Sequence, residues 1–162
     1  NSLSDLGRID EAIPAYDRAV ELDPQYESAW YNNGEALTDQ GRYDEAAQAY
    51  IEAIKINPEN KGAWNNIGNV LSVQGRYDEA LPAYDVAIRL SPGEADFWHN
   101  KGYALAELGR YEEAIQVYDR ALELDPQDAD AWHNKGVALN LLNRTAEASV
   151  ALARAEELDL KA

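Results

Sequence analysis

A repeat of 34 residues runs along the whole chain and constrains its fold more than any other feature. The same residue type returns every 34 positions at Trp30, Trp64, Trp98 and Trp132 and at Pro24, Pro58, Pro92 and Pro126. Two Gly positions and two Ala positions keep the same interval. A fixed period of this length is the signature of an array whose units stack on their neighbours. We therefore expect a single array of 162 residues, with a partial repeat at 1–26 and full repeats at 27–60, 61–94, 95–128 and 129–162.

Each repeat is predicted to form two helices, as residues 95–128 illustrate. Residues at steps of three and four share one face of a first helix, namely Trp98, Gly102 and Leu105. Asp96 suits the N-cap of that helix, and Gly109 suits the position just past its C-terminus. Pro126 follows the second helix and ends it. The predicted fold class is therefore all-α, with small residues where the two helices cross and with Trp and Tyr filling the space between neighbouring repeats.

The residues kept in the repeats form the pattern W-x-x-x-G-x-x-L, then G-R-Y-D/E-E-A, then Y-x-x-A and P. This pattern resembles the tetratricopeptide repeat (TPR) over the whole chain. The resemblance implies helix–turn–helix pairs in a right-handed superhelix, a TPR solenoid whose first helices line a concave groove. The last repeat departs from the pattern at Asn143 and Leu152, as an end repeat does. Because residue 1 is Asn, Met is absent and the first repeat starts within its first helix, we expect a piece of a longer or engineered chain.

Composition excludes several classes of function. The chain has 30 acidic and 14 basic residues and a formal net charge of −16. That charge disfavours binding to nucleic acid and to anionic membranes. The absence of Cys excludes disulfides, Cys-ligated zinc and thiol catalysis. No apolar run approaches the ~20 residues that span a bilayer, and no signal sequence is present, so we expect a soluble, cytoplasmic protein.

Candidate binding residues follow from the positions within the 34-residue repeat, here called slots, that the resemblance places on the groove. One slot holds Asn in every full repeat, and an amide both donates and accepts hydrogen bonds, so a ladder of them can bind the backbone of an extended peptide. The alternative is that these Asn side chains bond neighbouring repeats. The candidate partner-binding residues are Asn32, Asn66, Asn100, Asn134, Tyr31, Glu35, Asn65, Asn69, His99, Tyr103, Glu107 and His133. The same face includes Asp39, Val137 and Leu141.

The charges on this face indicate which partner it suits. Carboxylates outnumber cations, which favours a neutral or basic segment. Lys101 and Lys135 stand one slot aside and are expected to reach the groove edge. The carboxylate clamp of co-chaperone TPR domains is not expected, because Asn65, Asp130 and Asn134 occupy the positions where that clamp needs cations.

The remaining titratable residues predict no enzyme, metal site or cofactor. His99 and His133 stand one repeat apart, which is too far to share one ion, and no nucleophile accompanies them. The Gly pattern contains no phosphate-binding motif. An Arg in the turn between the helices is interpreted as a surface ion-pair residue at Arg8, Arg42, Arg76, Arg110 and Arg144.

Three functions remain open after these exclusions. The first is a scaffold that holds an extended or helical partner segment in the groove. The second is a non-catalytic arm of a larger enzyme, such as a glycosyltransferase. The third is self-association through the incomplete first repeat, where Leu3, Leu6 and Ile13 are expected to expose apolar surface.

Overall fold

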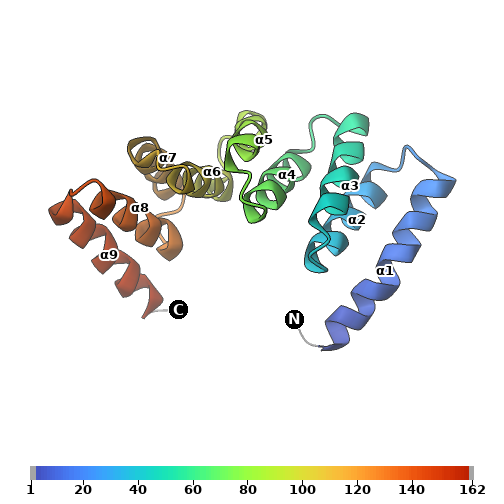
Figure 1. Ribbon diagram of the computed structural model, residues 1–162, viewed down its shortest axis with the longest axis horizontal. Coiled ribbons are helices and arrows are strands. Elements are labelled where there is room, and N and C mark those ends of the chain that lie inside the picture. The colour runs from blue at the N-terminus through green and yellow to red at the C-terminus, as the bar shows by residue number, and fades with distance from the viewer. Residues whose placement is uncertain (1–2, 161–162) are drawn as a thin grey trace. The chain divides into compact units, whose positions relative to one another are not determined.

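The computed structural model describes the backbone of residues 3–160 and the side chains of residues 12–160. The described residues are helical throughout, with short turns and no strand, and form two compact units, residues 1–76 and 77–162 (Figure 1). The first unit contains α1 (Leu3–Leu22), α2 (Glu27–Asp39), α3 (Tyr43–Ile56) and α4 (Lys61–Val73). The second contains α5 (Tyr77–Leu90), α6 (Ala95–Glu107), α7 (Tyr111–Leu124), α8 (Ala129–Leu141) and α9 (Thr145–Asp159).

The helices follow the predicted repeat pattern. Helix α2 packs on α3 in the first unit, and α6 packs on α7 and α8 on α9 in the second. The repeat at 61–94 contributes α4 to the first unit and α5 to the second. The all-α prediction is thus confirmed. The partial repeat differs from the expectation, because α1 continues through Gly7 without a break. Glycine permits a left-handed turn but adopts the right-handed helical conformation as well, so it does not end a helix by itself.

In the full repeats the first helix ends on a left-handed residue. Gly109 has φ +74°, its N–H donates to Ala106 O at 2.9 Å, and the next N–H, of Arg110, donates to Leu105 O at 2.9 Å. This pair of bonds satisfies carbonyls at the helix end. The same conformation recurs at Gly41 and Gly75. Asn143, with φ +60°, occupies the corresponding turn of the last repeat, because Asn tolerates this conformation better than other non-glycine residues.

The start of α6 differs from the prediction, and two other first helices have side-chain caps. Asp96 is not the N-cap of α6, because the helix already begins at Ala95 and Asp96 lies in its first turn. Side-chain caps occur on two other first helices. Asn60 Oδ1 accepts from Ala63 N, and Asp128 Oδ1 accepts from Ala131 N, both at 2.8 Å. The slot before the helix therefore provides the cap, since its side chain can reach the free N–H groups of the first turn.

The core lies between the two helices of each repeat. The buried face of every second helix combines a repeated Ala with a large residue, and the Tyr members Tyr50, Tyr84 and Tyr118 are almost fully enclosed. Gly102 provides the space for one of them. A Cβ built on Gly102 would lie 2.6 Å from Cε1 of Tyr118, inside van der Waals contact. The expectation that small residues stand where the helices cross is confirmed for α6 and α7.

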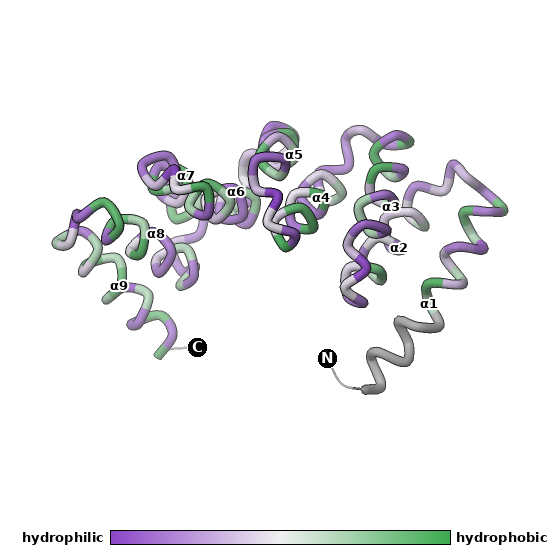
Figure 2. The backbone as a smooth tube through the Cα atoms, in the orientation of Figure 1, coloured by the Kyte–Doolittle hydropathy of each residue, from purple (hydrophilic) through white to green (hydrophobic). Residues whose placement is uncertain are grey.

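From residue 12 onward, hydrophobic and hydrophilic residues alternate along the helices, as expected for helices that bury one side (Figure 2). Within the described part of the chain, no helix combines the length and apolar character needed to cross a bilayer.

Of the three residues expected to expose apolar surface, Ile13 is only 6 % exposed because α1 packs on α2. The side chains of Leu3 and Leu6 lie outside the described residues.

Of the five turn Arg residues, three form the expected surface ion pairs, namely Arg42, Arg110 and Arg144, and the side chain of Arg8 lies outside the described residues. Nε and a terminal nitrogen of Arg110 donate to the two carboxylate oxygens of Glu113, each at 2.7 Å, and Arg42–Glu45 and Arg144–Glu147 repeat this geometry. The hydrogen bonds from Arg110 lower the pKa of Glu113. Both partners are exposed to water, so these pairs contribute little to stability.

The repeated Trp and Pro residues are joined by a hydrogen bond that their spacing alone did not predict. In all four cases the indole Nε1 donates to the carbonyl of the Pro six residues earlier, at 2.9–3.1 Å. The four Trp side chains are half-buried rather than enclosed. Each Trp therefore attaches the loop that precedes a repeat to the first helix of that repeat.

Replacing one indole tests this bond. We expect Trp98→Phe to lower the free energy of unfolding by about 1–2 kcal/mol, because Pro92 O loses its donor while an aromatic ring remains. Urea denaturation followed by circular dichroism measures the change. Trp98→Phe as stable as the wild type would contradict a stabilising role for this bond.

Candidate functional site

Two pockets occupy equivalent places in the repeats, one in each unit. The first has a volume of about 390 Å³ and is lined by α2, α3 and α4 through Glu35, Thr38, Asp39, Tyr50, Asn66 and Asn69. The second has a volume of about 210 Å³ and is lined by α6, α7 and α8. Every lining residue of the first has a counterpart 68 residues later that lines the second: Tyr103, Ala106, Glu107, Tyr118, Asn134 and Val137. The repeat geometry thus builds one kind of pocket twice.

A chain of hydrogen bonds forms the floor of the first pocket. Asn66 Nδ2 donates to the Tyr31 hydroxyl at 3.2 Å and to the Tyr50 hydroxyl at 3.4 Å. The Thr38 hydroxyl donates to Gly34 O at 2.8 Å and lies 3.3 Å from the Tyr50 hydroxyl. Since the single Thr38 hydrogen is already used, Tyr50 donates to Thr38 and accepts from Asn66. The Tyr50 hydroxyl is therefore fully satisfied inside the protein.

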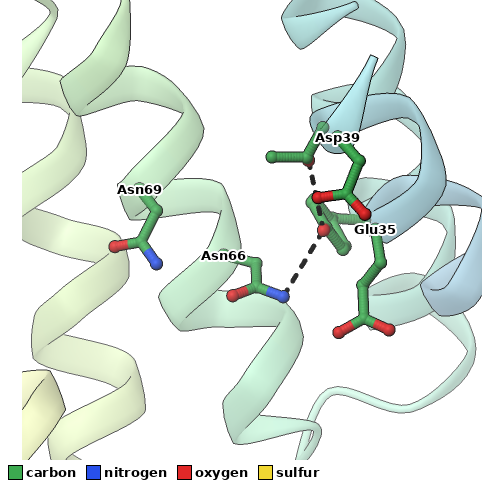
Figure 3. Close-up of a pocket in the computed structure, with 6 residues that line it drawn as sticks. Glu35, Asp39, Asn66 and Asn69 are labelled. Atoms are coloured by element: carbon green, nitrogen blue, oxygen red, sulfur yellow. Dashed lines mark hydrogen bonds between the residues drawn. The ribbon is translucent and has the colours of Figure 1, made fainter. Parts of the chain in front are cut away.

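The walls of the first pocket are acidic. Glu35 and Asp39 reach it from α2, while Asn66 and Asn69 reach it from α4 (Figure 3). Both carboxylates are exposed, and no basic residue among those described lines the pocket. Burial, followed by the nearby charge of Glu35, raises the pKa of Tyr31 to about 12. The site therefore carries negative potential and hydrogen-bonding amides, which suits a cationic or hydrogen-bond-donating group.

The four Asn residues of the predicted ladder occupy the same slot of α2, α4, α6 and α8 and are half-buried. The amides of Asn66 and Asn134 contact the preceding repeat, since Asn134 Nδ2 lies 3.3 Å from His99 Nε2. The bonding between repeats that stood as the alternative is therefore present at these two positions. It uses the nitrogen of the amide, and in Figure 3 the Asn66 carbonyl oxygen points away from the Tyr50 hydroxyl.

The other predicted residues are distributed unevenly. The first pocket brings together Glu35, Asn66 and Asn69, and the second brings together Tyr103, Glu107 and Asn134. Asn65 is only 8 % exposed, so its side chain is not presented to a partner in this structure. Tyr31 lies at the edge of the first pocket as a hydrogen-bond partner of Asn66.

The two His residues differ in environment. His99 Nδ1 lies 2.7 Å from Asp128 Oδ2, and its ring packs edge-on against Tyr118 with centroids 6.0 Å apart. His99 therefore connects α6 to the residue that caps α8. His133 is exposed on α8. No group of three or more His, Asp or Glu side chains within the described range is arranged to hold a metal ion.

The expectation that Lys101 and Lys135 reach the groove edge is wrong. Lys101 Nζ lies 2.6 Å from Asp85 Oδ1 on α5, and Lys135 Nζ lies 2.5 Å from Asp119 Oδ1 on α7. Both cations pair with the second helix of the preceding repeat. Their slot faces that helix, and in the first unit Asn33 uses the same slot to donate to Asp17 Oδ1 at 3.0 Å. The carboxylates that line the two pockets are thus not neutralised by these lysines.

Sequence reasoning missed the pocket floor, formed by Thr38, Tyr50, Ala106 and Tyr118. Tyr50 and Tyr118 come from second helices and were interpreted only as space-filling residues. The sequence did contain a signal for these two residues. Phe would fill the same space, so Tyr at a buried position indicates that its hydroxyl forms a hydrogen bond.

Comparison with known proteins identifies the fold. The profile of the family described as the C-terminal domain of cilia and flagella-associated protein 70 matches residues 3–162. The crystal structure of MamA is similar with a TM-score of 0.91 and 22% identity, covering 96% of this chain and 91% of that chain. MamA 41-end from Desulfovibrio magneticus RS-1 is similar with a TM-score of 0.90 and 22% identity, covering 96% and 88%. At this identity the likeness to MamA concerns the fold alone.

A third structure, YrrB, is described as a TPR protein with an unusual peptide-binding site. It is similar with a TM-score of 0.83 and 28% identity, covering 96% of this chain and 80% of that chain. A search of curated proteins finds no match. Since 424 chains of known structure match this fold, the fold alone does not select a partner.

Proposed function

The chain belongs to the TPR family described as the C-terminal domain of cilia and flagella-associated protein 70, and from this premise we propose that it binds an extended, basic segment of a protein partner. TPR proteins act as interaction scaffolds, and YrrB is described as having a peptide-binding site. In the first unit the partner segment lies along α2 and α4 and places a basic side chain in the first pocket.

The acidic character of the first pocket carries this proposal. Glu35 and Asp39 face Asn66 and Asn69 across a space of about 390 Å³, with no basic residue among the described ones lining it. A Lys or Arg side chain supplies the cation that these carboxylates lack, which gives electrostatic complementarity and faster association. The Asn66 carbonyl oxygen accepts a backbone N–H of the segment, so the amide both joins repeats and contacts the partner. This dual role accommodates both interpretations of the Asn ladder.

Neutralising the pocket tests the proposal. Peptides are first selected on the wild-type chain by display. We expect the double variant Glu35→Gln, Asp39→Asn to bind the selected peptide at least about tenfold more weakly, equivalent to ~1.4 kcal/mol. The salt dependence of binding should also decrease, because fewer exposed charges contribute. Isothermal titration calorimetry at two salt concentrations measures both effects.

The matched control removes the same charge elsewhere in the first unit. Glu52 and Glu59 do not line the pocket, so Glu52→Gln, Glu59→Gln should bind the peptide like the wild type. Asn66→Ala adds a test of the ladder, with its melting temperature recorded because Asn66 also bonds Tyr31 and Tyr50. Equal affinity of the pocket double variant and its control would refute the proposal.

A further inference from the structure

The second pocket differs chemically from the first at the same slots. Tyr103 replaces Glu35, Ala106 replaces Thr38 and Val137 replaces Asn69, while Glu107 keeps the carboxylate of Asp39. Further apolar wall comes from Leu141 on α8. The side chains of Tyr103, Val137 and Leu141 are exposed. The second pocket is therefore mostly apolar with one carboxylate, whereas the first pocket is acidic.

Its floor contains the buried hydroxyl of Tyr118. Tyr118 is 0 % exposed, and its hydroxyl has no hydrogen-bond partner among the described residues. Two replacements accompany this difference. Ala106 lacks the hydroxyl oxygen with which Thr38 accepts from Tyr50, and His99, in the place of Tyr31, lies within hydrogen-bond distance of the Asn134 amide. Buried polar groups are nearly always paired, so an unpaired one bordering a pocket points to a ligand that pairs with it.

The surroundings of this hydroxyl specify the charge of such a ligand. Burial, and then the fields of Tyr103, Glu107 and Asp128, raise the pKa of Tyr118, so the phenol stays neutral and can accept a hydrogen bond. Glu107 accepts from the Tyr77 hydroxyl at 3.4 Å and remains exposed beside the pocket. A negative field over a hydrogen-bond acceptor favours a cation with N–H donors. A neutral aromatic side chain would instead desolvate Glu107 without pairing it.

We propose that the second pocket binds an arginine side chain of the partner segment. Its methylenes pack against Val137 and Leu141, its guanidinium plane lies against the Tyr103 ring, and its N–H groups donate to Glu107 and to the Tyr118 oxygen. At about 210 Å³ the pocket is smaller than the ~300 Å³ of the smallest drug-sized sites, which is consistent with a single side chain. Lysine fits less well, because its ammonium is a point charge without a planar face to stack. This inference deepens the proposed function and rests on it for the partner segment.

The test uses single-residue probes on the full chain, followed by methyl NMR at Val137 and Leu141. The probes are the N-acetyl methylamides of arginine, citrulline, lysine and tyrosine. We expect the arginine probe to shift both methyl groups with millimolar affinity and to bind at least tenfold more tightly than citrulline, its neutral isostere. Citrulline, lysine or tyrosine binding as tightly as arginine would overturn the proposal, as would the absence of shifts at these methyl groups.

Two variants assign the contacts. Tyr118→Phe keeps the ring and should weaken the arginine probe about fivefold through loss of one hydrogen bond. Glu107→Gln should weaken it more and should reduce its advantage over citrulline. Tyr26→Phe, on an exposed Tyr outside both pockets, is the matched control and should leave binding unchanged. Unchanged binding to Tyr118→Phe would contradict the role of the buried hydroxyl.

The two pockets can fail independently as binding sites. In one outcome, the double variant Glu35→Gln, Asp39→Asn binds the selected peptide more weakly, but the arginine probe does not bind at Val137 and Leu141. The segment-binding function then stands and the arginine pocket fails. In the other outcome, the arginine probe binds at Val137 and Leu141, but the double variant Glu35→Gln, Asp39→Asn has the same affinity for the selected peptide as the wild type. The arginine pocket then stands and the proposed docking in the first pocket fails.

Discussion

Gly102→Val is expected to lower the free energy of unfolding by about 3 kcal/mol, at the upper end for overpacked cores. A Cβ at this position lies 2.6 Å from Cε1 and 2.8 Å from Cδ1 of Tyr118, closer than carbon atoms approach. The ring cannot move aside easily, because Tyr118 is fully enclosed on α7. The gain in helix propensity on replacing Gly is a few tenths of a kcal/mol and does not offset the overlap.

Urea denaturation of the full chain measures this effect, with the midpoint as the observable because repeat arrays can unfold in steps. Gly93→Val is the matched control, since no atom lies within 4 Å of the position of its Cβ. Gly34→Val should repeat the loss in the first unit, where the same approach to Tyr50 Cε1 measures 2.6 Å. A midpoint for Gly102→Val equal to that of Gly93→Val would show that the helices separate without penalty.

Removing the hydroxyl from the two equivalent tyrosines is expected to have opposite effects on stability. Tyr50→Phe should lower the free energy of unfolding by about 1 kcal/mol, because Thr38 and Asn66 each lose one hydrogen bond. Tyr118→Phe should raise it by about 1 kcal/mol, because it removes a buried hydroxyl that has no partner among the described residues. The expected difference between the variants is therefore ~2 kcal/mol from the same chemical change.

Parallel urea titrations of the wild type and both variants measure this difference. Equal losses in the two variants would mean that the Tyr118 hydroxyl is satisfied in solution, which would remove the main support for the arginine pocket. A stabilised Tyr118→Phe that also binds the arginine probe more weakly would show that the hydroxyl serves binding at the expense of stability, as residues of binding sites often do.

The helix ends after Gly and the helix crossings at small residues could be predicted, because each depends on local backbone chemistry or on the size of one residue. Gly109 follows α6 in a left-handed conformation, which glycine favours at a helix end whatever its neighbours in the sequence are. The small Gly102 stands where α6 meets α7, as its size indicates. The N-cap of α6 was predicted wrongly at Asp96, and α1 continues through Gly7, because residues that permit a cap or a turn do not require one.

The binding residues were predicted less completely, because a slot on a helix does not determine the partner of its side chain. Lys101 and Lys135 share their helices with the groove residues, yet the preceding second helix offers Asp85 and Asp119, and the cations pair there. Asn65 lies in a slot expected to face the groove and is buried.

The sequence by itself determined the 34-residue period, the all-α fold and the acidic net charge. These follow from periodicity and composition, which act along the chain. The tertiary structure alone decided which hydroxyls and amides meet. Tyr50 and Tyr118 occupy the same slot of the repeat, and each is enclosed by its own repeat and the first helix of the next. One hydroxyl is paired and the other has no partner among the described residues, because a hydrogen bond depends on atoms from three helices brought within about 3 Å of each other.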